Sequence, residues 1–177
     1  MDKEKLEKVK SVIRDVPDFP SKGILFRDLT TVFKDGEALG IIGEELHEMY
    51  KDLGVTKVVG IEARGFVGAS ILAYDLKAGF VPLRKPGKLP ADTIQKTYQK
   101  EYGTDTIEIH ADAIDENDVV IIHDDVLATG GTMAAAVELV KKFGVKKVYV
   151  NFIIELDVLE GRKILTGATE VDTLIHM

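Results

Sequence analysis

The fold of this chain is decided by the stretch Val119-Val120-Ile121-Ile122-His123-Asp124-Asp125-Val126-Leu127-Ala128-Thr129-Gly130-Gly131-Thr132. Its first four residues are apolar and β-branched, and together with His123 they predict a buried strand. Two acids and a run of small residues follow, and a helical pattern begins at Thr132 and continues to Phe143. A buried strand that turns tightly into a helix is the building unit of an α/β sheet.

The same alternation of helix and strand extends along the chain. Apolar residues at helical spacing predict helices around Leu6, Val9, Ile13 and Val16, and over residues 37–53 and 65–76. Short apolar or alternating runs predict strands over residues 55–61, 79–84, 104–110 and 147–154. These elements predict a mostly parallel sheet covered by helices on both faces. Residues 85–100 lack a clear period and are predicted to form a mobile surface loop.

Length and charge narrow the class of protein. The 177 residues suit one domain, and the net charge of −7 argues against general nucleic-acid binding, which needs a basic surface. There are no cysteines, and the charged N-terminus has no apolar signal core. No apolar run reaches the roughly 18 residues of a membrane span. We therefore expect a soluble cytoplasmic protein with no nucleic-acid or membrane partner.

The turn after the predicted strand has the chemistry of a sugar-phosphate site. The residues Thr129 to Thr132 allow several backbone N–H groups to converge at a helix N-terminus, which favours a phosphate. Asp124 and Asp125 are placed to accept hydrogen bonds from sugar hydroxyls, or to face Mg²⁺ through water. The structural alternative is a helix capped by an aspartate after an ordinary glycine turn.

In this order, the strand, the two acids and the Thr-Gly-Gly-Thr loop resemble the donor-binding motif of the type I phosphoribosyltransferases. The resemblance implies an α/β fold with a central, mostly parallel sheet flanked by helices and a small flexible hood. It also implies Mg²⁺ as cofactor and 5-phosphoribosyl 1-diphosphate as donor. The ribose 5-phosphate would be bound by Asp124, Asp125, Ala128, Thr129, Gly130, Gly131 and Thr132.

Four further segments resemble the adenine branch of that family, in order from near residue 17 to near residue 160. They are Pro17-Asp18-Phe19-Pro20 with Gly23-Ile24-Leu25-Phe26-Arg27-Asp28, Gly60-Ile61-Glu62-Ala63-Arg64-Gly65-Phe66, Arg84-Lys85-Pro86-Gly87-Lys88-Leu89-Pro90 with Tyr98-Gln99-Lys100-Glu101-Tyr102-Gly103, and Ile154-Glu155-Leu156. The resemblance implies a single domain over residues 1–177, with a base-recognition segment at 1–35 and a flexible hood loop at 85–103.

The branch resemblance also implies roles for individual residues. Adenine would be bound by Leu25, Phe26, Arg27 and Leu156, with the Phe26 ring stacked on the base. The diphosphate would be bound by Ala63, Arg64, Arg84, Lys85 and Lys88. Some of the last three would reach the site of the partner in a homodimer. Catalysis would involve Arg64, Glu101 as proton donor or orienting group at the purine, and Tyr102 as a shield.

Each of these residues has a simpler structural interpretation. Arg64 would form a surface ion pair with Glu62, Phe26 would belong to the core, and the cations after residue 83 would face solvent. His123 departs from the family, which has a small apolar residue there, and we expect it to be packed or hydrogen-bonded away from the ligand.

The resemblance implies that the chain joins adenine to 5-phosphoribosyl 1-diphosphate and forms AMP and diphosphate. Two other functions compete with this one. One is transfer to another purine base, such as hypoxanthine, xanthine or guanine. The other is a ligand-sensing regulator without catalysis. The acidic charge and the short segment before residue 17 argue against a regulator, which would need a DNA-binding module.

Overall fold

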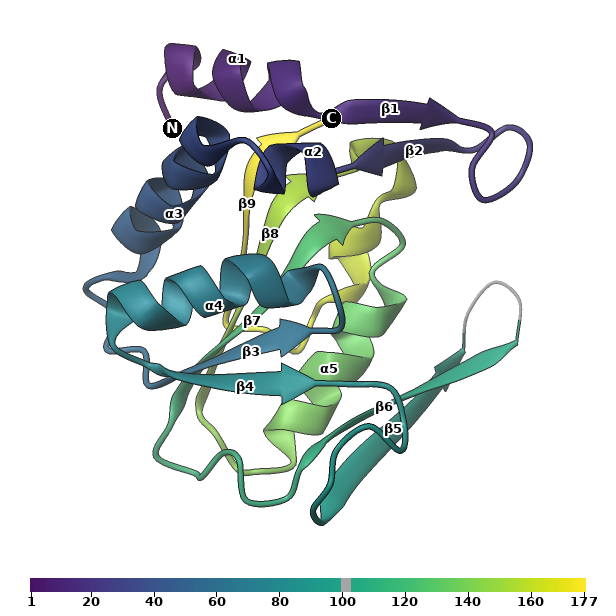
Figure 1. The fold of residues 1–177 in the computed structure, drawn as a ribbon. Coiled ribbons are helices and arrows are strands. Elements are labelled where there is room, and N and C mark those ends of the chain that lie inside the picture. Colours follow the sequence, from purple (N-terminus) through teal and green to yellow (C-terminus); the bar gives the residue numbers. More distant parts are fainter. Residues whose placement is uncertain (100–102) are drawn as a thin grey trace.

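The computed structural model describes residues 1–99 and 103–177, and its centre is a five-stranded parallel sheet (Figure 1). The order across the sheet is β4 (Gly79–Leu83), β3 (Lys57–Ile61), β7 (Val119–Leu127), β8 (Lys147–Glu155) and β9 (Glu170–His176). Every neighbouring pair is parallel. Parallel neighbours need long connections across a face of the sheet, and helices supply most of them. The predicted α/β fold is therefore confirmed.

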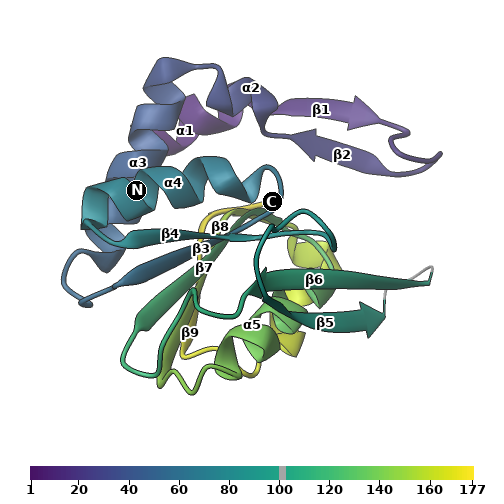
Figure 2. The ribbon, with the colours of Figure 1, turned by 60° about the horizontal axis from the view of Figure 1, so that its bottom comes forward.

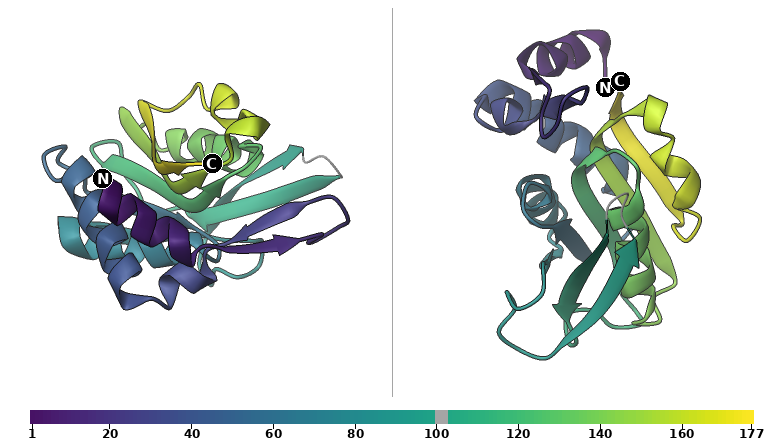
Figure 3. Two further views of the ribbon diagram at one scale, coloured as in Figure 1. Left: turned by 90° about the horizontal axis from the view of Figure 1, so that it is seen from above. Right: turned by 90° about the vertical axis from the view of Figure 1, so that its right-hand side faces the viewer.

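Helices cover both faces of this sheet, as Figure 3 shows from two further directions. The helices are α1 (Lys3–Val12), α2 (Thr30–Phe33), α3 (Gly36–Tyr50), α4 (Gly65–Leu76) and α5 (Gly131–Lys141). Because side chains alternate along a strand, each strand feeds two cores. Val58 and Ile121 pack on the side of α3 and α4, and Val59 and Ile122 pack on the side of α5. This burial fixes the height at which each strand ends, and hence the position of the loops.

Two antiparallel hairpins extend beyond the carboxyl ends of the central strands (Figures 1 and 2). They consist of β1 (Arg14–Pro17) with β2 (Leu25–Asp28), and of β5 (Thr93–Gln99) with β6 (Thr104–His110). Two short 3₁₀ helices, η1 (Asp157–Leu159) and η2 (Gly161–Ile164), follow β8. The hairpins and these short helices therefore surround the edge of the sheet where ligands of open α/β sheets bind.

Two expectations from the sequence are wrong. The segment 85–100 is not a loop throughout, because residues Thr93–Gln99 form β5. Ile94, Lys96 and Tyr98 alternate with exposed residues, but the lysine hides this period. Lys96 forms an ion pair with Glu138 of α5.

The first helix is also shorter than predicted. It ends at Val12, and Val16 lies in β1 opposite Phe26. Strand β9 and the two 3₁₀ helices were not predicted. Within the residues that the structure describes, none of the helices has the length and apolar character needed to cross a membrane.

Candidate active site

The end of β7 and the start of α5 form a tight backbone loop at the predicted phosphate site. Gly130 has a φ of 82°, in the left-handed region that glycine adopts readily. A Cβ atom there would lie 2.5 Å from the Gly161 carbonyl oxygen, so a side chain has no room. A cavity of about 100 Å³ is lined by Asp124, Val126, Leu127, Ala128, Thr129, Gly130, Thr132, Met133 and Phe152. Free amides at the N-terminus of α5 suit it to an anion.

Thr132 of this loop also contacts the second hairpin. Its Oγ1 lies 2.9 Å from the hydroxyl of Tyr98 in β5. The hairpin of β5 and β6, which belongs to the predicted hood, is thus hydrogen-bonded to the predicted phosphate loop (Ala128–Thr132). The sequence did not predict this contact.

The two acids lie inside β7 rather than after it. Asp125 is 2% exposed, and the two carboxylates are neighbours at the carboxyl end of the strand. Burial, together with the adjacent charge of Asp125, raises the pKa of Asp124 well above its ordinary value. The backbone N–H of Asp125 donates to Asp124 Oδ1 at 2.9 Å. Both carboxylates therefore lie at the same edge of the sheet.

Arg64 pairs with Asp125 and not with Glu62, so the alternative interpretation of Arg64 as the partner of Glu62 in a surface ion pair does not hold. The Arg64 Nε donates to Asp125 Oδ2, and Nη2 lies 3.4 Å from Asp125 Oδ1. The guanidinium carbon also lies 5.4 Å from the centre of the Phe26 ring. Arg64 comes just before α4 and follows a cis peptide bond between Glu62 and Ala63. It therefore joins the base segment, the acids of β7 and the loop after β3.

Glu62 instead holds the cations of the hood. Arg84 donates to both of its carboxylate oxygens at 3.3 and 3.4 Å, and the Lys88 ammonium also pairs with it. The backbone N–H of Lys85 donates to Glu62 at 3.0 Å, while its ammonium pairs with Asp105 of β6. Burial alone would raise the pKa of Glu62, but these hydrogen bonds outweigh it and lower the pKa to about 2. The predicted diphosphate cations are therefore gathered beside the Glu62-Ala63-Arg64 loop.

The base segment faces the two acids across one cavity. This cavity measures about 260 Å³ and is lined by Ile24, Leu25, Phe26, Arg27, Arg64, Asp124, Asp125, Val126, Ala128, Leu156 and Leu159. All four residues predicted to bind adenine line it, together with three residues predicted to bind the ribose 5-phosphate (Asp124, Asp125 and Ala128) and Arg64. Phe26 is not a core residue: it also lines a second cavity of about 330 Å³ and meets Phe19 edge-on at 5.1 Å.

Glu101 and Tyr102, predicted to act in catalysis, lie outside the described residues. Leu159 lines the base cavity but was not predicted, because it lies in a 3₁₀ turn without an apolar period. The expectation for His123 is confirmed: it is fully buried, and its Nδ1 lies 2.8 Å from Asn151 Oδ1.

Comparisons with known proteins agree with this geometry. A family model for the phosphoribosyl transferase domain matches residues 34–173. An adenine phosphoribosyltransferase of Bacteroides fragilis is 62% identical over 97% of this chain and 95% of its own length. A crystal structure of the Rhodothermus marinus adenine phosphoribosyltransferase superposes with a TM-score of 0.93 at 50% identity, covering 99% of this chain and 100% of that one.

A third relative carries a ligand. The Giardia lamblia enzyme, solved in complex with 9-deazaadenine, superposes with a TM-score of 0.92 at 43% identity over 97% of both chains. Since the family model and the relatives cover most of the chain, they establish its family. The chain belongs to the phosphoribosyl transferase family, in the branch of the adenine phosphoribosyltransferases.

Proposed function

We propose that this chain salvages adenine by joining it to 5-phosphoribosyl 1-diphosphate, which gives AMP and diphosphate. One observation carries the proposal: a single cavity is lined by the base segment around Phe26, by the acids of β7 and by Arg64. Base, sugar and leaving group thus have adjoining sites. The family membership of the chain gives the same activity.

The reaction breaks the bond between the ribose and the diphosphate, so positive charge grows on the ribose carbon and negative charge on the leaving group. Arg64 is placed to stabilise the departing diphosphate, and the cations Arg84, Lys85 and Lys88 are gathered beside the same loop. A preorganised donor of this kind is typically worth roughly 3 kcal/mol in the transition state. Asp124 and Asp125 accept from the ribose hydroxyls in this proposal.

Mg²⁺ belongs to the proposal as the cofactor. Asp124 and Asp125 would hold this ion through water, and the donor and water would supply the oxygen ligands that it prefers. Mg²⁺, when bound, neutralises charge on the leaving diphosphate. No direct protein ligand is proposed.

The hood is proposed to close over the reacting atoms and exclude water, which would otherwise hydrolyse the donor. The hydrogen bond between Tyr98 and Thr132 supports a hood that is anchored near the phosphate loop. Glu101 as the group at the purine and Tyr102 as a shield rest on the family resemblance alone.

We further propose that residues 1–177 form one domain and act in the cytoplasm as a homodimer. Tyr74 of α4 and Phe80 of the edge strand β4 are exposed aromatic residues on neighbouring elements. Arg84 directly follows β4, so a partner bound on this side would lie close to the hood cations. This supports the expectation that some of them serve the partner's site.

The test is to supply the purified chain with the donor, Mg²⁺ and each free purine in turn. We expect nucleotide to form with adenine at a rate far above that with hypoxanthine, xanthine or guanine. Faster conversion of another base would assign the chain to that base. Donor binding without product from any purine would favour a ligand-sensing protein.

A further inference from the structure

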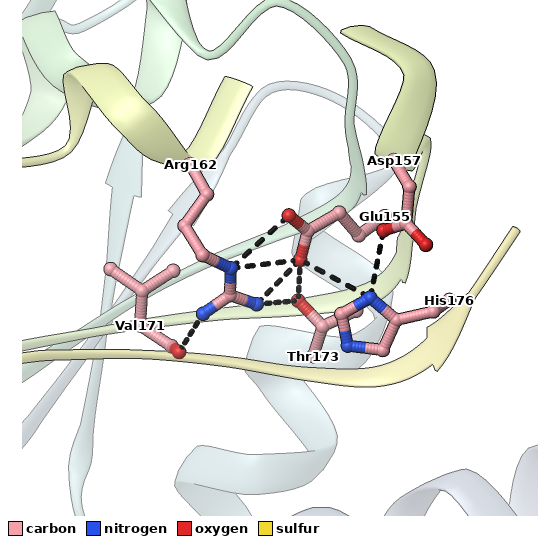
Figure 4. A network of polar contacts seen from close by, with 6 residues as sticks. All are labelled: Glu155, Asp157, Arg162, Val171, Thr173 and His176. Atoms are coloured by element: carbon pink, nitrogen blue, oxygen red, sulfur yellow. Dashed lines mark hydrogen bonds and ion pairs between the residues drawn. The ribbon is translucent and has the colours of Figure 1, made fainter. Parts of the chain in front are cut away.

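A buried carboxylate at the end of β8 ties a short helix to two strands (Figure 4). Glu155 is 5% exposed and accepts from Arg162 Nε at 3.1 Å on both of its oxygens. Arg162, in η2, also donates to the Val171 carbonyl oxygen and, at 3.1 Å, to Thr173 Oγ1 in β9. The Thr173 hydroxyl in turn donates to Glu155 at 3.0 Å. A guanidinium with partners on two strands holds the helix in one position.

This cluster holds η2 against the strands and is not a metal centre. Glu155, Asp157 and His176 lie close enough to share an ion, but the guanidinium of Arg162 already engages both oxygens of Glu155. Asp157 and His176 are exposed and pair with each other at 2.8 Å. The polar atoms therefore serve to fasten η2.

The position of η2 matters because its first residue, Gly161, is in direct contact with the phosphate loop. A Cβ atom on Gly161 would lie 2.1 Å from the Ala128 carbonyl oxygen and 3.0 Å from the Gly130 amide nitrogen. In the reverse direction, a Cβ atom on Gly130 would meet the Gly161 carbonyl oxygen. The two backbones touch with no side chain between them, so a movement of η2 moves the loop.

The same segment reaches the base cavity from its other end. Leu156 and Leu159 line that cavity, and they lie between Glu155 and Gly161 in sequence. The Leu156 amide donates to the Leu127 carbonyl oxygen of β7 at 2.9 Å. The segment from Glu155 to Arg162 is therefore a bridge, fastened at both ends, between the base cavity and the phosphate loop.

We propose that Arg162 is a positioning residue for donor binding: its contacts to Glu155, Val171 and Thr173 hold the Gly161 backbone against the phosphate loop and so fix the amides that bind the 5-phosphate. The proposal rests on the assignment of Ala128–Thr132 as the phosphate loop. Arg162 itself touches no reacting atom.

The test uses Arg162→Met, which keeps an unbranched apolar stem and removes the guanidinium, and Gly161→Ala, which pushes η2 away from the loop. For each variant, the KM for the donor, kcat, and the inhibition constant of ribose 5-phosphate are measured well below the unfolding temperature. We expect the donor KM and the inhibition constant to rise roughly ten- to a hundredfold, since small misplacements of a site have effects of this size. The turnover at saturating donor should change less, because the 5-phosphate contact does not change during the reaction.

Matched controls are Lys163→Met, which removes an exposed cation from the same 3₁₀ helix, and Gly40→Ala, where an added Cβ meets nothing within 4 Å. Both should stay within about twofold of the parent, as exposed substitutions usually do. Thr129→Ala separately tests the phosphate loop. Suppose that Thr129→Ala raises the inhibition constant of ribose 5-phosphate, while Arg162→Met and Gly161→Ala both leave it within twofold of the parent value. The positioning role is then refuted and the loop assignment stands. If Thr129→Ala has no effect on this constant either, the positioning role and the assignment of the phosphate loop are both refuted. Should Arg162→Met fail to fold, Gly161→Ala decides alone.

Discussion

The histidine at the centre of the sheet should make the protein sensitive to acid, and the substitution His123→Asn should remove this sensitivity. His123 is fully buried, with Nδ1 at 2.8 Å from Asn151 Oδ1. Its Nε2 has no hydrogen-bond partner among the described residues. That nitrogen points at α4, where a Cβ atom on Gly68 would lie 2.2 Å away. A proton added there would place a positive charge against a helix backbone, away from water.

Burial therefore lowers the pKa of His123 from 6.5 to about 4, although the hydrogen bond with Asn151 and the charge of Asp125 act in the opposite direction. The unfolded chain binds this proton more readily than the folded one, so folding free energy is lost as the pH falls below 6.5. At about 1.4 kcal/mol per pH unit, the gap corresponds to a loss of about 2 kcal/mol by pH 5 and about 3 kcal/mol by pH 4. Above pH 7 the contribution is fully present and no longer changes.

The assay is urea unfolding of the parent and of His123→Asn at intervals from pH 8 to pH 4. The variant keeps an amide that can donate to Asn151 and has no group that titrates in this range. A cavity will destabilise it at all pH values, so the difference between the two curves is the informative quantity. His47, His110 and His176 are present in both proteins and cancel in that difference. Curves that stay parallel from pH 7 to pH 4 would refute the reasoning.

Three further substitutions test the site. Asp125→Asn removes the partner of Arg64 and weakens the ribose contacts, so kcat/KM for the donor should fall about ten- to a hundredfold in steady-state kinetics, the usual loss for a hydrogen bond to a charged group; unchanged kinetics would remove Asp125 from the site. Glu62→Gln frees Arg84 and Lys88, and the product inhibition constant of diphosphate should fall by about fivefold or less, because these pairs are partly exposed; weaker diphosphate binding would mean that Glu62 positions the cations. Phe26→Ala removes the predicted stacking surface, so the KM for adenine should rise about tenfold while the KM for the donor stays unchanged; equal changes in both would instead indicate a general collapse of the cavity.

The parts of the fold that follow from local periodicity were predictable. The strand that ends in Asp124 and Asp125 and the helix after Gly131 are marked by apolar residues close together in sequence. Strand β5 was not predicted because a lysine, Lys96, occupies one of its inward positions. Its aliphatic stem packs there, and its ammonium reaches Glu138. Strand β9 was not predicted because its alternating run contains Asp172 and Thr173. Asp172 accepts from Tyr50, and Thr173 donates to Glu155.

The predicted base, ribose and diphosphate residues that lie among the described residues do gather at one edge of the sheet, but their pairings were not predictable. Glu62 is the acid nearest to Arg64 in sequence, yet Arg64 pairs with Asp125, 61 residues away. Since β3 and β7 are neighbours in the sheet, their carboxyl ends meet. The need for glycine at position 161 has a similar origin, because it arises from the Ala128 carbonyl oxygen on another part of the chain. Contacts of this kind are set by the tertiary fold.

The ion pairs of the site differ in what they mean for donor binding. Arg64 and Asp125 pair with each other, but both are assigned to the donor, one to its diphosphate and the other to its ribose. In the proposed complex with the donor, each would have a new partner, so breaking this pair would leave neither charge unsatisfied. Glu62 has no proposed role toward the donor and competes with the diphosphate for Arg84 and Lys88. Removing the negative charge of Asp125 should therefore weaken donor binding, and removing that of Glu62 should strengthen diphosphate binding, although each carboxylate pairs with a cation of the same site.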